Sequence, residues 1–484
     1  MGVGLLGILL GLSGLVWLSF RGWSVLVLAP GAALIAALAA GEPLLAHWTM
    51  TFMGAAAGFL AQFFPLFLLG AVFGKLMDDS GSVTAIARFM TEKLGPRRAI
   101  LAVVLAGAAV TYGGVSLFVA FFVLGPMAQA LFRTADIPNR LIPAAIGLGT
   151  FTFTMSALPG TPSIQNSIPM PFFGTTPFAA PGLGIVAAAI MLGFGLWWLR
   201  RQEAAARRAG EGFGAAVATN AGADDTLVRE RATTSGSFDP AEIHHGGHGD
   251  SSPSAFAAAL PLLVVVAVNL VVSMLVLPRV DTGFLADARW GGVQLSSVSG
   301  VWSVIVALAV AIATLVVVNR KRLPALRNTV DAGANASVLP VLSVASLVGF
   351  GAVVAAMPAF AVVRDWVLSI GGGPLVSLAL ATNILAALTG SASGGLTIAL
   401  DALGGTYMQL AAELGMDPGL MHRVAVIGAG TLDSLPHNGA VVTLLAVCGA
   451  THKESYFDIV MVCIVGAVLG LVAVIVLGST FGSF

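Results

Sequence analysis

A short motif of glycine and threonine, followed by a Leu-Pro pair, occurs once in each half of this chain. The first copy reads Ile146-Gly-Leu-Gly-Thr150 and is followed by Leu158-Pro159; the second reads Ile427-Gly-Ala-Gly-Thr431 and is followed by Leu435-Pro436. Both copies lie in apolar segments, where a plain membrane helix would carry Leu or Val. Because proline lacks a backbone N–H and clashes with the preceding turn, neither segment can be a regular helix throughout. The motif therefore predicts two similarly built halves, each with one broken helix.

Composition places the chain in a membrane. It has 484 residues, of which 57% are hydrophobic and 10% are charged, whereas a soluble protein carries about 25% charged residues. Apolar runs of about 20 residues, enough to cross a bilayer core of about 30 Å, recur along the whole length. The formal net charge is zero, so nothing indicates a nucleic-acid partner. We therefore predict an all-α polytopic membrane protein.

The apolar runs predict about twelve spans plus two re-entrant hairpins. Residues 114–132 and 394–412 are the candidates for the hairpins, because both are flanked by glycine and lead into a broken segment. The first run is interpreted as a retained span, since it lacks a basic start and a small-residue cleavage site. The expected apolar segments lie at 3–19, 24–41, 54–76, 97–112, 114–132, 141–156, 183–199, 255–277, 299–318, 337–357, 372–389, 396–412, 421–432 and 456–478.

Basic residues predict the orientation of the spans, because Lys and Arg gather in cytoplasmic loops. Placing all the basic clusters in the cytoplasm makes spans 54–76 and 337–357 run in opposite directions. We therefore predict that the two halves are inverted repeats. The clusters lie at Arg21, 75–98, 200–208 and 320–327.

The predicted division of the chain follows from these halves. Residues 201–254 are polar and rich in Gly, Ala, Ser and Thr, which predicts a disordered cytoplasmic linker. Its cluster His244-His245-Gly-Gly-His248 is interpreted as part of a flexible loop, with metal binding as the alternative. The expected parts are N-terminal accessory spans in 1–53, a first inverted repeat in 54–200, the linker in 201–254, connecting spans in 255–334 and a second inverted repeat in 335–484.

The first break carries a dense set of hydroxyl and amide side chains at membrane depth. Pro159 and Pro162 free backbone groups, which survive in a membrane only when buried in protein or beside a wet cavity. A helix that restarts after Pro162 directs its N–H groups at the break, which suits a carboxylate. The alternative is a kink satisfied by its own Ser and Thr. The polar side chains are Thr150, Thr152, Thr154, Ser156, Thr161, Ser163, Gln165 and Asn166.

The second break carries two ionisable residues, Asp433 and His437. Such residues inside spans are costly and usually functional. Histidine changes charge near neutral pH and an aspartate can bind a proton, so the pair can carry a proton or balance an anionic substrate. The alternative is a structural pair that holds the break closed. Asp401, upstream, is either a proton carrier or an acid at the membrane interface.

Glycine-rich turns precede both breaks, in 111–116 and 389–397. Their small side chains and exposed carbonyls suit a hard cation or a carboxylate, although such turns also let helices pack closely. No P-loop occurs, because the segment Gly70–Lys75 has the wrong glycine spacing and no Ser or Thr follows the lysine. Cys448 and Cys463 lie in apolar sequence and are interpreted as packing residues rather than as a disulfide or a metal site. Paired Gly/Pro breaks in two halves indicate the central site of a secondary transporter.

At these motifs the chain resembles the gluconate permease-like (GntP) family of the ion transporter superfamily. The likeness covers nearly the whole chain apart from the linker, and the Asp433–Gly439 run is most similar to the branch of 3-hydroxybutyrate permeases. The residues that carry the likeness are Gly70 to Gly74 with Asp79-Ser80-Gly81, Thr154 to Pro162 with Gln165 and Asn166, Phe173 to Thr176, and Leu432 to Gly439.

The resemblance implies a proton-coupled symporter for small hydroxy-carboxylates, with a scaffold, a moving transport domain and usually a homodimeric state. It implies no cofactor beyond the coupling ion. The Ser-Asn-Thr runs of sodium-coupled members are absent here, so proton and sodium stay as alternatives. The implied substrate-binding residues are Thr154, Ser156, Gly160, Thr161, Gln165, Asn166, Ser391, Ser393, Ser434, His437 and Asn438. Proton coupling is expected at Asp433, His437 and Asp401.

The sequence thus predicts a multi-pass symporter of the bacterial inner membrane that takes up a small organic anion with a proton. The anion would be 3-hydroxybutyrate or a gluconate-like acid. The expected partners are this carboxylate, membrane lipid and a second copy of the chain. The alternatives are a sodium-coupled carrier, a passive organic-anion channel and a membrane-embedded enzyme, which the missing hydrolase and metal motifs disfavour.

Overall fold

The computed structural model describes residues 2–21, 23–214, 238–239, 242, 245–247 and 251–484. Every regular element within these ranges is a helix, which confirms the predicted all-α class. Two N-terminal helices, α1 (Gly2–Phe20) and α2 (Val25–Ala40), pack against each other. The hydroxyl of Ser24 accepts the N–H of Leu26 and so begins α2.

A first series of helices follows this pair. It starts with one long continuous helix, proceeds through a helical hairpin and a broken helix, and ends with a second long helix. Its elements are α3 (Leu44–Ala46), η1 (His47–Phe52), α4 (Met53–Asp79), α5 (Ser82–Leu94), η2 (Pro96–Arg98), α6 (Ala99–Tyr112), α7 (Leu117–Ala135), η3 (Asn139–Leu141), α8 (Ile142–Thr150), α9 (Phe153–Ser156), α10 (Ile164–Ser167), α11 (Pro169–Phe173) and α12 (Pro181–Arg208).

A second series repeats this order of elements near the C-terminus. The long helix is α16, the hairpin is α18 with α19, the broken helix is α20 with α21, and the final long helix runs from α22 to α23. Its elements are η9 (Arg320–Arg322), α16 (Leu326–Ala356), α17 (Phe360–Leu368), α18 (Pro374–Thr389), α19 (Ala392–Leu414), α20 (Pro418–Thr431), α21 (Gly439–Val447), α22 (His452–Ile459), η10 (Val460–Val465) and α23 (Gly466–Phe481).

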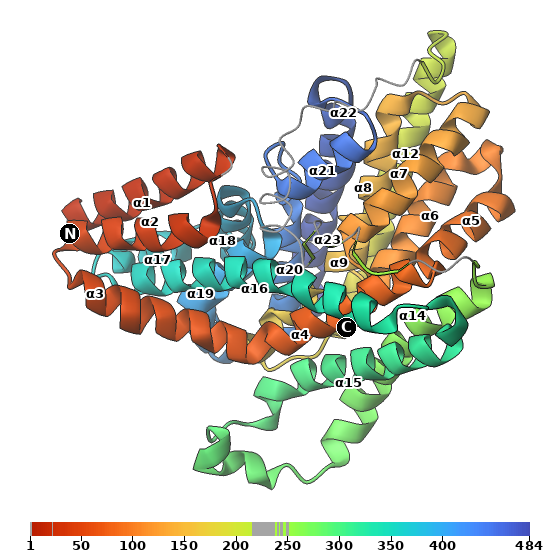
Figure 1. Cartoon of the computed structure of the whole chain (residues 1–484). Coiled ribbons are helices and arrows are strands. Elements are labelled where there is room, and N and C mark those ends of the chain that lie inside the picture. Colours follow the sequence, from red (N-terminus) through yellow and green to blue (C-terminus); the bar gives the residue numbers. More distant parts are fainter. Residues whose placement is uncertain (1, 22, 215–237, 240–241, 243–244, 248–250) are drawn as a thin grey trace.

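A pair of connecting helices lies between the two series in the sequence. Figure 1 shows them as a hairpin along the lower side of the molecule, while the broken helix of the second series lies near its centre. The pair packs on α4, α5 and α11. Its elements are α14 (Ala255–Val271), η5 (Val272–Val276), η6 (Leu277–Arg279), η7 (Gly283–Ala286), η8 (Ala288–Trp290) and α15 (Leu295–Val318).

The long helices α4 and α16 pack along each other, and a hydroxyl group of α16 donates to a buried ion pair within α4. Lys75 and Asp79 are fully buried, with 2.9 Å between Nζ and Oδ1. The hydroxyl of Thr329 on α16 donates to the Asp79 carboxylate at 2.6 Å. The two helices approach closely at Gly333, where a Cβ atom would lie 2.7 Å from the Cα of Val72. The first long helices of both series are therefore fixed to one another.

The predicted number of twelve spans is not confirmed. Among the described residues, eight helices are long and apolar enough to cross a membrane, or nine if α5 with the following helix is counted as one span bent by 101°. Residues 114–132 and 394–412, predicted as re-entrant hairpins, are each the second helix of a hairpin. The turn comes before them because the flexible glycines precede the apolar run rather than dividing it.

The predicted linker is ordered at its start. Helix α12 continues to Arg208, because the Ala- and Arg-rich residues after 200 favour a helix. Further on, Phe238 is fully buried in the main apolar cluster. Residues 244 and 248, two of the three histidines in the predicted cluster, lie outside the described residues. No group of three metal-ligating side chains occurs in the part of the chain that the structure describes.

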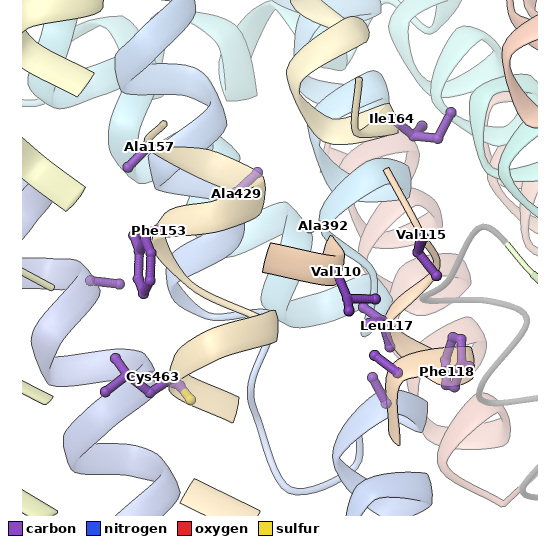
Figure 2. Packing of buried hydrophobic residues seen from close by; sticks show 14 of the residues in the cluster. Val110, Val115, Leu117, Phe118, Phe153, Ala157, Ile164, Ala392, Ala429 and Cys463 are labelled. Atoms are coloured by element: carbon purple, nitrogen blue, oxygen red, sulfur yellow. The ribbon is translucent and has the colours of Figure 1, made fainter. Parts of the chain in front are cut away.

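One apolar cluster encloses both broken helices. Figure 2 shows members of this cluster from both hairpins, Val110, Phe118 and Ala392, and from both broken helices, Phe153 and Ala429. Cys463 belongs to the same cluster and is free, as is Cys448, which agrees with their interpretation as packing residues. Both broken helices thus pack against a largely apolar interior.

Candidate functional site

Each broken helix meets the tip of the hairpin from its own series. Gly114 turns the chain between α6 and α7 in the left-handed region (φ 94°), and Gly390 does so between α18 and α19 (φ 63°). A Cβ at Gly114 would lie 2.6 Å from the ring of Pro162, so glycine permits the close approach of the first tip to the first break. Ser391 begins α19, where its hydroxyl accepts an N–H of the first turn at 3.1 Å.

The hydroxyl groups at the start of the first break bind mostly the backbone of their own helix. Thr150 and Thr152 each donate to a carbonyl one turn earlier at 2.8 Å. Thr154 donates to the carbonyl of Gly149 at 3.1 Å, and Ser156 donates to that of Thr152 at 3.1 Å. A kink satisfied by its own Ser and Thr, the alternative raised from the sequence, therefore describes this stretch.

The first hairpin holds the first break at two points. The Thr111 hydroxyl, at the end of α6, lies 3.2 Å from both the Thr154 hydroxyl and the Gly149 carbonyl. The next residue, Tyr112, donates its hydroxyl to the carbonyl of Pro159 at 2.7 Å. These contacts come from the glycine-rich turn that the sequence analysis identified.

Beyond the prolines the helix restarts with capped N–H groups. The hydroxyl of Ser163 accepts the N–H of Asn166 at 3.4 Å, and the hydroxyl of Thr161 accepts the N–H of Ser163 at 3.4 Å. The amide of Asn166 donates to the carbonyls of Thr161 at 3.0 Å and Pro177 at 3.1 Å. Gln165 is buried beside them. The predicted N-terminal donors are thus present and engaged within the chain.

A fully buried arginine, missed in the sequence analysis, reaches the first break from α20. Arg423 donates to the carbonyl of Ser156 at 3.1 Å, to Oδ1 of Asn166 at 3.2 Å and to the carbonyl of Ala179 at 2.7 Å. No carboxylate of the described residues forms an ion pair with it. Its guanidinium therefore supplies donors to carbonyls that the break sets free. A basic residue inside an apolar segment was the available signal.

The neighbouring residue His422 links this layer to a cavity. Its Nε2 lies 3.2 Å from Oδ1 of Asn166, and its Nδ1 lies 2.7 Å from the hydroxyl of Thr175. Thr175 and Ala179 line a cavity of about 460 Å³ between the loop after α11 and the start of α20. The buried His422 and Arg423 thus separate this cavity from the first break.

A second missed side chain reaches the first break from the connecting pair. Asn269 of α14 donates from Nδ2 to the carbonyl of Gly160 at 3.2 Å. Gly160 takes a left-handed conformation (φ 83°), and a Cβ there would lie 2.5 Å from the ring of Phe178. A single Asn in an apolar span belongs to no motif, so sequence spacing did not point to it.

The second break places an acid at the start of a helix. Oδ1 of Asp433 accepts the backbone N–H of Ala392, in the first turn of α19, at 2.8 Å. The same oxygen accepts Nδ2 of Asn438 at 2.8 Å. Asp433 is half-buried, and no basic side chain of the described residues forms an ion pair with it. The carboxylate lies where the positive end of the helix dipole favours an anion.

The other polar residues of the second break also contact the second hairpin. Nδ2 of Asn438 donates to the carbonyl of Gly390 at 2.9 Å, and its Oδ1 accepts an N–H that begins α21 at 2.7 Å. Nε2 of His437 lies 3.3 Å from the carbonyl of Ala387. Ser434 is held through its backbone, whose carbonyl accepts the Tyr456 hydroxyl at 3.2 Å. His437 and Asp433 thus bind different atoms of the hairpin.

The structure brings most of the predicted site residues into two adjacent groups. Thr154, Ser156, Gly160, Thr161, Gln165 and Asn166 surround the first break, while Ser391, Ser393, Asp433, Ser434, His437 and Asn438 surround the second. The groups meet where a Cβ at Gly430 would lie 3.2 Å from that of Ser156. Asp401 lies elsewhere: it is exposed on α19, about 14 Å along the helix axis from Ala392.

A polar cluster fixes the start of the first broken helix. Arg140 forms ion pairs with Glu211 at 2.9 Å and with Asp458 at 2.8 Å. Trp198 donates its indole N–H to Asp458 at 2.9 Å. The hydrogen bond to Glu211 is the main cause that raises the pKa of Arg140. These ion pairs and this hydrogen bond therefore connect the segment before α8 to α12, to the residues that follow α12, and to α22.

The sequence and the fold of this chain are similar to those of known membrane transporters. A family model described as "GntP family permease" matches residues 4–171. The "Uncharacterized transporter YxjC" of Bacillus subtilis strain 168 is 40% identical over 476 residues, which are 96% of this chain and 98% of that protein. An uncharacterized transporter of Haemophilus influenzae is 32% identical over 120 residues, or 25% of this chain and 28% of that protein.

Two solved structures share the fold at low sequence identity. MtrF of Neisseria gonorrhoeae, described among a class of antimetabolite efflux pumps, aligns with a TM-score of 0.53 and 13% identity, covering 90% of this chain and 84% of its own. The YdaH transporter of Alcanivorax borkumensis aligns with a TM-score of 0.50 and 16% identity, covering 90% of this chain and 87% of its own. Both are similar in fold alone.

Proposed function

Because this chain belongs to the GntP family of permeases, we propose that it carries a small hydroxy-carboxylate, such as 3-hydroxybutyrate or a gluconate-like acid, together with a proton. It is a membrane transporter and not an enzyme. The proposed location is the bacterial inner membrane, and the proposed assembly is a homodimer. The observation that carries the proposal is the contact of Asp433 with the start of α19.

The contact of Asp433 offers a physical means of coupling. Its carboxylate accepts the N–H of Ala392 and the amide of Asn438, both at 2.8 Å. An ionised carboxylate binds such donors more strongly than a neutral carboxyl group does. A proton on Asp433 therefore weakens both contacts and releases the donors at the start of α19. The substrate carboxylate then takes these donors, so the proton and the anion bind together.

The remaining polar groups define how the substrate would lie. His437 and Asn438 contact the same hairpin tip as Asp433 and are available to the carboxylate after the tip is released. The first break lies next to the second, at Ser156 and Gly430. Its hydroxyl groups donate to backbone carbonyls, but their oxygens keep lone pairs that can accept a hydrogen bond from the hydroxyl group of the substrate. The second break thus offers groups for the carboxylate of a hydroxy-acid, and the adjacent first break offers groups for its hydroxyl.

The test is uptake of labelled 3-hydroxybutyrate into proteoliposomes under an inward proton gradient in sodium-free buffer, with excess gluconate as competitor. We expect accumulation above the outside concentration that a protonophore abolishes. Competition by gluconate separates the two substrate candidates, because accumulation that resists it favours the hydroxybutyrate branch.

Other outcomes of the same measurement identify the alternatives. Accumulation of either acid that requires sodium and ignores the proton gradient would replace the proton with sodium as the coupling ion. Equilibration without accumulation, under every gradient, would indicate a passive anion channel. Protein-free vesicles and vesicles with heat-denatured protein set the background.

A further inference from the structure

Asn269 is a polar residue in an otherwise strongly apolar helix. It belongs to a helical segment, Ala255–Arg279, that is long and apolar enough to cross a membrane. Its side chain is fully buried. An amide at membrane depth is unfavourable unless both its donor and its acceptor find partners. We therefore ask whether both the donor and the acceptor of the Asn269 amide have hydrogen-bond partners within the protein.

Only one side of the Asn269 amide has a partner. Nδ2 donates to the carbonyl of Gly160 at 3.2 Å, whereas Oδ1 has no hydrogen-bond partner among the described residues. Rotating the amide would place its oxygen against the Gly160 carbonyl, and two acceptors repel each other, so the contact fixes the orientation. Buried polar atoms without partners are rare in native proteins. This acceptor is enclosed by the protein in the present conformation, so a donor from outside the chain reaches it only when the first break opens.

Helix α14, which carries Asn269, contacts both the first hairpin and the first break. Leu262, two turns before Asn269 on α14, lies against the first hairpin, because a Cβ at Gly113 would contact its side chain. Tyr112 of that hairpin holds the carbonyl of Pro159 at 2.7 Å, and Asn269 holds the next carbonyl, that of Gly160. Asn269 therefore faces the first break directly, at the prolines that interrupt the helix.

The chemistry of the free atom selects its ligand. A carbonyl oxygen accepts hydrogen bonds and donates none, so it attracts a hydroxyl group and repels a carboxylate. The donors nearby are already used, since Tyr112 donates to Pro159 and the amide of Asn166 donates to Thr161 and Pro177. A substrate hydroxyl is therefore the donor that fits this position.

We propose that Asn269 is a specificity-determining residue, whose Oδ1 accepts a hydrogen bond from the hydroxyl group of the transported hydroxy-acid. The inference rests on the proposed function and adds to it the residue that distinguishes a hydroxy-acid from the corresponding plain carboxylate. A site built to bind a hydroxyl group rejects an analogue without it, because its own polar group is then left unpaired.

The experiment compares pairs of acids that differ in hydroxyl groups. Binding of 3-hydroxybutyrate against butyrate, and of gluconate against hexanoate, is measured by calorimetry on the full chain in detergent. Of whichever pair the wild type binds, we expect it to prefer the hydroxylated member: gluconate by more than one hydrogen bond accounts for, since it carries five hydroxyl groups, and 3-hydroxybutyrate by about 10-fold, as for one net hydrogen bond. In Asn269→Ala the preference for either acid should fall by about 10-fold, while the affinity for the plain acid stays unchanged.

Three further variants make the result specific. Asn383→Ala removes another buried asparagine, whose amide donates to a carbonyl of its own helix at 2.8 Å, and should keep the preference. Tyr112→Phe removes the contact to the neighbouring carbonyl of Pro159 and should also keep it. Asn269→Gln retains an amide of similar polarity but displaces its oxygen, and it should lose the preference even if Asn269→Ala fails to fold.

The outcomes separate this inference from the proposed function. An undiminished hydroxyl preference in both folded Asn269 variants would overturn the inference alone. Equal loss of affinity for both members of a pair would assign Asn269 a structural role and would also overturn it. A wild type that binds none of the four acids would contradict the proposed function, and the role of Asn269 with it.

Discussion

The two breaks share a sequence motif but differ in how they are closed. Residues 160–170 of the first break are all buried, and its freed carbonyls are held by Arg423, Tyr112 and Asn269. In the second break Asp433 is half-buried and Pro436 is exposed. Its main contact is a carboxylate on a backbone N–H of the hairpin. The first break is thus fixed by permanent donors, whereas the second depends on one group that a proton can change.

The largest expected effect is on the first break, from Arg423→Ala. The variant leaves the carbonyls of Ser156 and Ala179 without their guanidinium donor and removes one of the two contacts to Oδ1 of Asn166, the other being that of His422. Since each orphaned buried acceptor costs about 1–3 kcal/mol, the free energy of unfolding should fall by about 3 kcal/mol or more. Denaturant unfolding in detergent measures it, with the exposed Arg97→Ala as control. Equal stability of the two variants would show that the first break does not depend on the guanidinium.

The next effect is on the second break, from Asp433→Asn. The variant keeps the shape of the side chain but no longer exchanges a proton, so uphill accumulation should fall to the level of protein-free vesicles. Exchange of labelled for unlabelled substrate should persist, because it needs no net proton movement. The exposed Asp331→Asn serves as control. Full proton-driven accumulation by Asp433→Asn would remove Asp433 from the coupling step.

His437→Ala should have an intermediate effect. Its imidazole contacts the second hairpin at the carbonyl of Ala387 and is proposed to bind the substrate carboxylate after release. Loss of one charged hydrogen bond corresponds to an increase in the half-saturation constant of about 10-fold. Uptake kinetics at saturating proton gradient measure this constant. An unchanged constant would argue that the imidazole serves only the hairpin.

The smallest effects compare the caps that follow the two breaks. Ser163→Ala removes a cap from the first restarting helix and should lower the unfolding free energy by about 1 kcal/mol. Asn438→Ala removes the cap of α21 together with its contacts to Asp433 and Gly390. It should therefore destabilise more, and it alone should alter the pH dependence of uptake. Identical pH profiles for both variants would contradict the assignment of the proton to the second break.

Features carried by local chemistry could be predicted from the sequence. Proline and glycine act on their own backbone, so both breaks and both glycine turns were identified by residue number. The apolar runs likewise gave most helices within a few residues. Helix α5 was missed, because Arg88, Glu92 and Lys93 interrupt its apolar character. The hairpins were misplaced by one helix, since a glycine turn does not show which flanking helix is paired through it.

Contacts across the chain could not be predicted. The hydroxyls of Thr150 and Thr152 look available in the sequence, yet both bind their own backbone. Arg423 and Asn269 look incidental, yet both face the first break. Tertiary packing decides which side of a helix faces a distant break. The spacing of residues in a single sequence does not reveal that packing. Asp401 lies near the motif in sequence, yet it is exposed about 14 Å along the axis of α19 from Ala392, and its role in proton coupling stays a prediction.

The contact of Arg423 with Ser156 has a consequence for how the chain is made. The two residues are separated by 267 positions, so the first half leaves the ribosome and enters the membrane long before its arginine exists. Until α20 is inserted, the carbonyls of the first break must accept hydrogen bonds from water or from insertion factors. Completion of this region is thus a late event that joins both halves at once. A chain truncated before α20 should therefore be degraded rather than persist as a folded half.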